Sequence, residues 1–129
     1  MDDRRKSQRK QTDQFFGVYH RETDEFIGRL VDMSTKGMMI HAVRPMDINA
    51  VYDFRIDLPK AIGGTERLSF EAECVRCTES TGSTENFEMG FKITDIDFKE
   101  LEMIQYLLND ALFHESEERP KVTMGKKSE

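Results

Sequence analysis

A series of short segments in which apolar and polar residues alternate limits the fold of this chain more than any other feature. In residues 52–58, Phe54, Ile56 and Leu58 alternate with charged residues, and Pro59 is expected to end the segment. Alternation of period two is typical of a β-strand that buries one face. Segments of this character cover residues 14–20, 26–32, 38–43, 52–58, 68–74 and 87–93. Six short strands with no helix between them predict an all-β domain, either an antiparallel barrel or a sandwich.

A helical pattern follows the last of these segments. Apolar residues such as Leu101 and Ile104 recur at helical spacing, which predicts one amphipathic helix over residues 98–113. We expect Asp97 to be the N-cap of this helix, with Glu100 completing a capping box. The helix is expected to cover an open end of the barrel.

Charge is distributed unevenly along the chain. Residues 1–10 carry five basic and two acidic side chains, a net of +3, so the remaining residues carry −9 of the total of −6. This acidic remainder is poorly suited to long nucleic acids, whose binding requires the neutralisation of many phosphates. A basic arm over residues 1–13 is either a solvated terminus or a means of binding one compact anion. The charged segment 114–129 is predicted to be a disordered tail.

The sequence also argues against a membrane or secreted protein. No uninterrupted apolar run approaches the ~18 residues that a membrane span needs. The charged N-terminus has no apolar stretch behind it, so we expect no secretory signal. Two cysteines do not form a disulfide framework. We therefore expect a cytoplasmic protein that does not insert into membranes.

Residues capable of catalysis or metal binding are scattered. Cys74 and Cys77 lie three positions apart on a predicted strand, so they should point to opposite faces at roughly 10 Å, which suits neither a disulfide nor zinc. Ser34 has no neighbouring His or Lys that could act as a base, and the three histidines lie in different elements. We expect no enzymatic activity, no metal site and no cofactor.

Two short motifs remain after these exclusions. The first is R-x-x-x-R, formed by Arg5 and Arg9. The second is D-x-S-x-x-G, formed by Asp32, Ser34 and Gly37 at a predicted hairpin turn, where the glycine is expected to adopt a positive φ. The planar arginine side chain can bind the guanine O6 and N7 atoms with two hydrogen bonds, grip a phosphate, or stack on a base. The residue chemistry therefore favours a ligand that contains guanine and phosphate.

Together the motifs and their order resemble the PilZ domain family, the receptors for cyclic diguanosine monophosphate (cyclic di-GMP). The resemblance covers roughly residues 3–113. Residues 28–40, GRLVDMSTKGMMI, look like the strand, turn and strand of the family signature, and residues 89–97 look like its last strand and the start of its helix. The resemblance implies a six-stranded antiparallel β-barrel with a C-terminal α-helix over residues 14–113, preceded by a flexible N-terminal arm.

The resemblance also implies a set of ligand-binding residues: Arg4, Arg5, Arg9, Asp32, Ser34 and Gly37. Arg5 and Arg9 would bind the guanine Hoogsteen edge and the phosphates. Asp32 would accept hydrogen bonds from guanine or orient an arginine, and the Ser34 hydroxyl would donate or accept a hydrogen bond. Gly37 would keep the turn compact. The arginine that precedes the first motif would add stacking.

The implied function is that of a cyclic di-GMP receptor and adaptor, which changes conformation on binding and relays the signal to a separate effector protein. The alternative is a PilZ-like protein–protein interaction module that does not bind nucleotide. A barrel that binds RNA or single-stranded DNA fits less well, because the strand faces are acidic and carry no basic stripe with interleaved aromatic residues.

Overall fold

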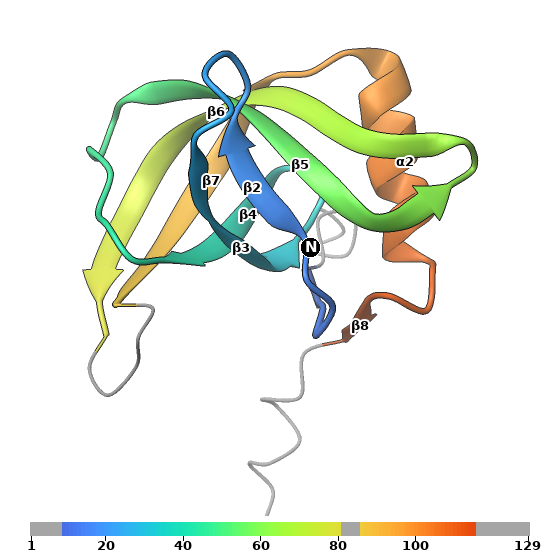
Figure 1. Cartoon of the computed structure of the whole chain (residues 1–129), viewed down its shortest axis with the longest axis horizontal. Helices are drawn as coiled ribbons and strands as arrows, with labels where there is room; N and C mark the ends of the chain where they lie inside the picture. Colours follow the sequence, from blue (N-terminus) through green and yellow to red (C-terminus); the bar gives the residue numbers. More distant parts are fainter. Residues whose placement is uncertain (1–8, 81–85, 116–129) are drawn as a thin grey trace, which may run out of the picture.

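Six antiparallel strands form a closed barrel in the computed structural model, which describes residues 9–80 and 86–115. The strands are β2 (Gly17–His20), β3 (Phe26–Met33), β4 (Gly37–Ala42), β5 (Val51–Ile62), β6 (Thr65–Glu79) and β7 (Phe87–Asp95). Their order is β2-β5-β6-β7-β4-β3, and an additional pairing between β2 and β3 closes the sheet (Figure 1). The predicted six-stranded antiparallel barrel is confirmed.

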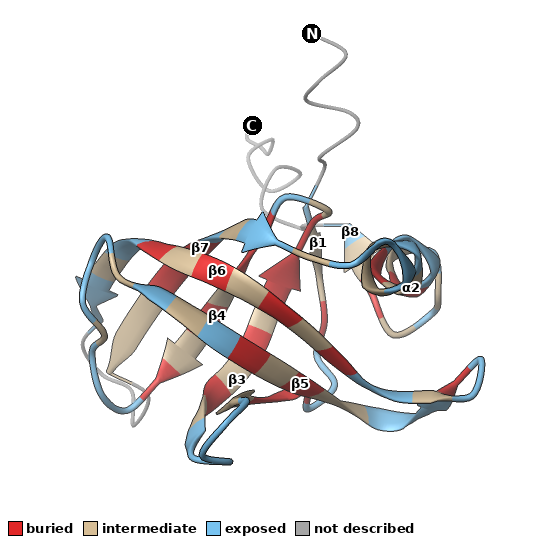
Figure 2. Ribbon diagram, turned by 90° about the horizontal axis from the view of Figure 1, so that it is seen from above, coloured by how far each residue is buried: buried red, intermediate tan, exposed pale blue. Residues whose placement is uncertain are grey.

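The core fills the inside of this barrel. Along β6, buried and less buried residues alternate, as predicted for a strand with one apolar face (Figure 2). Phe54, Phe70 and Phe91 are at most 2 % exposed and meet in the centre, where the rings of Phe54 and Phe91 pack edge to face with centroids 4.9 Å apart. Aromatic packing of this kind adds to the free energy gained from burying the rings.

One helix follows the barrel. Helix α2 (Phe98–Leu108) adds Ile104 and Leu107 to the core and ends earlier than predicted. After Leu108 the backbone N–H groups of Asn109 and Asp110 bond to carbonyls only three residues back, which ends the α-helical pattern. The Asp110 carboxylate then accepts the N–H of Leu112.

The predicted capping box of this helix is wrong. Asp97 occupies the N-cap position, but its side chain makes no capping hydrogen bond. The Glu100 carboxylate instead accepts the backbone N–H of Ser69 at 3.1 Å, which ties the first turn of α2 to β6. Glu100 is therefore engaged by a residue of another strand, and the local spacing of Asp97 and Glu100 does not reveal that contact.

Irregularities in the sheet overturn two further expectations. Pro59 does not end β5, which continues to Ile62 across a shift of register. Such an irregularity accommodates the missing N–H of proline. Cys74 and Cys77 do not point to opposite faces, because a β-bulge follows Cys74 in β6: Cys74 is buried and Cys77 packs against the same core. Both are free thiols.

Two short strands join the ends of the described chain. β1 (Lys10–Gln11) pairs with β3 on one side and with β8 (His114–Glu115) on the other. The Thr12 hydroxyl donates to the carbonyl of Leu112 at 2.6 Å. Residues 10–11 thus belong to the sheet although they were predicted in the arm, and residues 114–115 do so although they were predicted in the disordered tail. The remainder of that tail lies outside the described residues.

Helices long and apolar enough to cross a bilayer are absent from residues 9–80 and 86–115.

Candidate functional site

The turn between β3 and β4 is shaped by a buried serine. Ser34 is 2 % exposed, and its backbone N–H donates to the carbonyl of Gly37 at 2.9 Å. Its hydroxyl oxygen accepts the backbone N–H of Lys36 at 3.1 Å. A hydroxyl has a second lone pair and one proton, so this bond leaves capacity for another partner. The Ser34 side chain therefore holds the turn closed and retains hydrogen-bonding capacity.

Gly37 is required for a reason other than the predicted one. Its φ is not positive, since Gly63 and Gly64 are the glycines with positive φ among the described residues. A Cβ atom at position 37 would instead lie 2.2 Å from the backbone carbonyl oxygen of Phe91. That distance is far below van der Waals contact, so only glycine allows the turn to lie this close to β7.

A bulge directs Asp32 to the outer face of the barrel. Leu30 pairs with Ile40 and Asp32 pairs with Met39, so Val31 is an extra residue in β3. In a regular strand Asp32 would share the inward face of Leu30, because residues two apart point to the same side. With the bulge, Asp32 emerges on the outside of the sheet and Met33 returns to the core.

Arg9 contacts Asp32 directly. Its Nη1 atom donates to Oδ1 of Asp32 at 2.6 Å, and the two side chains are 49 % and 10 % exposed. Gln11 pairs with Asp32 between β1 and β3, and this pairing brings Arg9, two residues earlier, to this position. The guanidinium of Arg9 is thus half-exposed to solvent, whereas the carboxylate that it contacts is nearly buried.

The electrostatics of Asp32 reflect competing effects. Burial raises the pKa of Asp32, the charge and hydrogen bond of Arg9 lower it, and the net result lies above the usual value of 3.8. Burial removes water from the carboxylate and penalises its charged form, whereas the guanidinium favours that form. The Asp32 carboxylate is therefore incompletely compensated and would gain from further hydrogen-bond donors.

The structure brings four of the six predicted residues to one place. Arg9, Asp32, Ser34 and Gly37 lie at the junction of β1, β3 and β4, whereas Arg4 and Arg5 fall outside the described residues. The sequence reasoning missed the bulge that orients Asp32. A signal for it exists, because Met33 is an apolar residue out of phase with Leu30.

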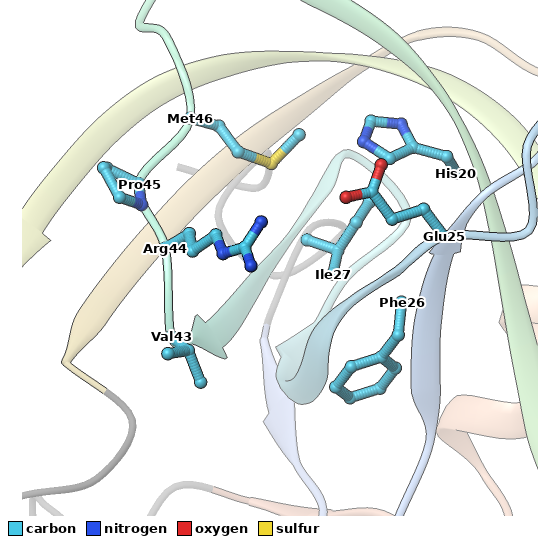
Figure 3. Close-up of a pocket in the computed structure, with 8 residues that line it drawn as sticks. All are labelled: His20, Glu25, Phe26, Ile27, Val43, Arg44, Pro45 and Met46. Carbon is cyan, nitrogen blue, oxygen red and sulfur yellow. The ribbon is translucent and has the colours of Figure 1, made fainter.

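A cavity of about 500 Å³ lies elsewhere on the barrel. It is lined by His20, Glu25, Phe26, Ile27, Val43, Arg44, Pro45 and Met46, whose side chains come from the β2–β3 hairpin and the segment after β4 (Figure 3). This cavity contains none of the predicted site residues. In the part of the chain that the structure describes, no group of three His, Cys, Asp or Glu side chains could hold a metal ion.

Comparison with solved structures identifies similar folds. The PilZ domain with c-di-GMP of YcgR from Escherichia coli is 13 % identical, with a TM-score of 0.61 over 81 % of this chain and 88 % of that one. The Bacillus subtilis inhibitor of motility MotI/DgrA is 20 % identical, with a TM-score of 0.64 over 81 % of this chain and 50 % of that one. The apo structure of K. pneumonia MrkH is 12 % identical, with a TM-score of 0.61 over 76 % and 46 %.

The chain thus spans about half the length of the MotI/DgrA and MrkH chains. A search of curated proteins finds no match. Residues 3–110 match the family model of the PilZ domain, which covers both motifs, the barrel and α2. This chain is a member of the PilZ domain family.

Proposed function

We propose that this protein is a cytoplasmic receptor for cyclic di-GMP that relays binding of the nucleotide to a separate effector protein. The observation that carries the proposal is the contact between Arg9 and Asp32, which unites two motifs 23 positions apart in the sequence. The turn beside them is held in one conformation by Ser34. Family membership and a similar fold that holds c-di-GMP add support.

Each motif would contribute a different part of the recognition. Arg5 and Arg9 bind the guanine Hoogsteen edge and the phosphates through paired hydrogen bonds. Arg4 adds a planar face for stacking on a base. Asp32 accepts hydrogen bonds from a guanine N–H group, and the Ser34 hydroxyl donates or accepts one more.

Binding would change the contact that Arg9 makes with Asp32 in the free protein. The ligand draws the guanidinium of Arg9 away from Asp32 or joins it there, and it supplies donors to a carboxylate that is incompletely compensated. Strand β1, which begins at the residue after Arg9, also pairs with β8, and the Lys10 ammonium donates to the carbonyl of Leu108 at the end of α2. A ligand that moves Arg9 therefore acts on a strand that also contacts the C-terminal side of the domain.

This coupling suggests how a signal would leave the site. The domain performs no chemistry on its ligand, so its output is a changed surface near β1, β8 and the end of α2. An effector protein that recognises this surface would distinguish the bound state from the free state.

The alternative is a PilZ-like interaction module that does not bind nucleotide. It is favoured by exposed aromatic residues near the cavity of about 500 Å³, where the rings of Phe15 and Phe26 stack with centroids 6.3 Å apart. Phe15 and Phe26 are 57 % and 51 % exposed, a property typical of protein contact surfaces.

A thermal-shift experiment separates the two functions. We expect cyclic di-GMP to raise the melting temperature of the wild type, and GTP and the linear dinucleotide to have little effect. Arg5→Ala should abolish the shift. Arg67→Ala, a change of a 64 % exposed arginine near Asp57, should leave the shift intact. The same melting curve of the wild type with and without cyclic di-GMP would favour the interaction module.

A further inference from the structure

A row of four residues crosses the outer face of the barrel, beginning at Asp32. Asp32 pairs with Met39 between β3 and β4, Met39 pairs with Gly90 between β4 and β7, and Gly90 pairs with Arg76 between β7 and β6. Three interstrand spacings of about 4.8 Å separate the backbones at its two ends by roughly 14 Å. The row therefore connects the candidate site to an arginine that belongs to neither sequence motif.

The same structural device directs the residues at both ends of this row outward. In β3 the extra residue Val31 precedes Asp32, and in β6 the extra residue Val75 precedes Arg76. Without its bulge, Arg76 would follow Cys74 into the core, because residues two apart share a face. Bulges that re-aim a side chain are over-represented next to functional sites.

Arg76 extends along the sheet toward Asp32. Its Nη2 atom lies 3.3 Å from the sulfur of Met39, and its Nη1 atom lies 3.5 Å from a carboxylate oxygen of Glu88. A Cβ atom on Gly90 would lie 3.6 Å from both Nε and Nη2 of Arg76. The guanidinium therefore rests over the bare backbone of Gly90 and reaches β4.

Arg76 remains accessible in this position. Its side chain is 50 % exposed, so a large part of its surface faces solvent. Glu88 is held in turn by His41, whose Nε2 atom lies 3.3 Å from the other carboxylate oxygen. The positive charge of Arg76 also lowers the pKa of Asp32, to a smaller extent than the charge of Arg9 does. Burial, which raises that pKa, is the largest effect. Arg9 and Arg76 thus flank the same carboxylate electrostatically.

We propose that Arg76, Met39 and Gly90 form a second purine-binding subsite, which takes the guanine of cyclic di-GMP that lies farther from Arg9. This inference rests on the proposed function and deepens it. A guanidinium plane stacks on a base, a thioether makes favourable contacts with an aromatic ring, and a glycine leaves room for both. A cyclic dinucleotide carries two purines on one ring, so a ligand anchored at Arg9 and Asp32 presents its second base along this row.

Titration calorimetry with cyclic di-GMP on Arg76 variants tests the subsite. We expect Arg76→Ala to weaken binding about tenfold, because loss of base stacking on a side chain has an effect of this size. Arg76→Lys should recover little of the affinity, since an ammonium group keeps the charge but has no planar face. Arg67→Ala on the same strand is the matched control and should bind as the wild type does. Unchanged melting temperatures would show that the variants fold.

The outcomes separate this inference from the function on which it rests. If the wild type and Arg76→Ala bind cyclic di-GMP with equal affinity, the second subsite is wrong and the proposed function stands. If Arg76→Lys binds as tightly as the wild type, Arg76 acts through its charge alone and the stacking subsite is wrong. If the wild type does not bind cyclic di-GMP, both proposals fail.

Discussion

Two hairpin turns of this barrel contain glycine for different physical reasons. At Gly63 and Gly64, between β5 and β6, the φ angles are 59° and 81°, and a Cβ on Gly64 would meet nothing within 4 Å. At Gly37 the backbone angle is ordinary, but a side chain would collide with the carbonyl of Phe91. The first turn needs a backbone conformation that glycine adopts without strain. The second turn needs a residue without a side chain, because the carbonyl of Phe91 occupies the place of the Cβ atom.

The surroundings of the two turns differ in the same way. Gly63 and Gly64 are exposed, whereas Ser34 and Asp32 beside Gly37 are buried polar residues. Burial of polar groups has a cost unless hydrogen bonds compensate for it. The comparison teaches that a turn pressed against a neighbouring strand, with buried polar side chains, is the one suited to hold a ligand in a fixed geometry.

The largest effect is expected from adding one methyl group to each turn. Gly37→Ala should lower the free energy of unfolding by about 3 kcal/mol, because backbone atoms of β4 and β7 must separate. Gly64→Ala should lower it by about 1 kcal/mol, since only the strain of a left-handed backbone arises. Urea unfolding of the two variants measures the difference. Equal losses would show that close packing does not distinguish the turns.

Removal of the charge on Asp32 tests whether the turn at Gly37 takes part in nucleotide binding. Asp32→Asn should weaken cyclic di-GMP binding at least tenfold, or about 1.4 kcal/mol, because a carboxylate acceptor is lost. The same variant should unfold no more easily than the wild type, since it removes a buried charge whose pKa shows incomplete compensation. Calorimetry and urea unfolding measure the two quantities.

The control for this substitution lies in β5, the strand that leads into the other turn. Asp57→Asn changes a carboxylate that contacts Arg55 at 2.9 Å on the outside of β5. We expect it to leave nucleotide affinity unchanged. A similar loss of affinity in both variants would mean that general electrostatic attraction, and not Asp32 itself, determines binding.

The smallest effect is expected from pH. Because burial raises the pKa of Asp32 above 3.8, the carboxylate takes up a proton earlier on acidification than an ordinary aspartate does. Folding favours the protonated form, so the contribution of Asp32 to stability is complete below pH 3.8 and is lost as the pH rises through the raised pKa. Ligand affinity should change in the opposite direction and fall a few-fold as the pH drops through that range.

Titrations with cyclic di-GMP at a series of pH values measure this dependence. The Asp32→Asn variant provides the reference, because it has no carboxylate at this position. Wild-type affinity that stays constant, or that changes with pH as the variant does, would show that ionisation of Asp32 has no role in binding.

The fold could be predicted from the sequence because local alternation determines which strands exist. Phe54 and Ile56 belong to an uninterrupted pattern and lie in the core as expected. The pattern could not reveal the row from Asp32 to Arg76, because the row depends on two bulges and on the pairing of Met39 with Gly90 between β4 and β7, which are distant in sequence. Arg76 belongs to neither sequence motif, and only the bulge at Val75 directs it to the outer face.

Four of the predicted site residues lie in the described part of the chain, and their physical surroundings differ from those expected. Asp32 and Ser34 were expected to face a ligand, and the structure adds that both are buried and that Ser34 closes the turn. The role of Gly37 was misjudged because its constraint comes from β7, which lies more than fifty positions later in the chain. A short-range rule for turns does not include such a contact.

The central claim is that Arg9 and Asp32 bind cyclic di-GMP together, and a calorimetric titration of the wild type and Arg9→Lys tests it most directly. Arg9→Lys keeps a positive charge beside Asp32 but lacks the planar group that makes paired hydrogen bonds. The account predicts that the wild type binds and that Arg9→Lys binds at least tenfold more weakly with an unchanged melting temperature. Equal affinity of the two proteins for cyclic di-GMP would contradict it.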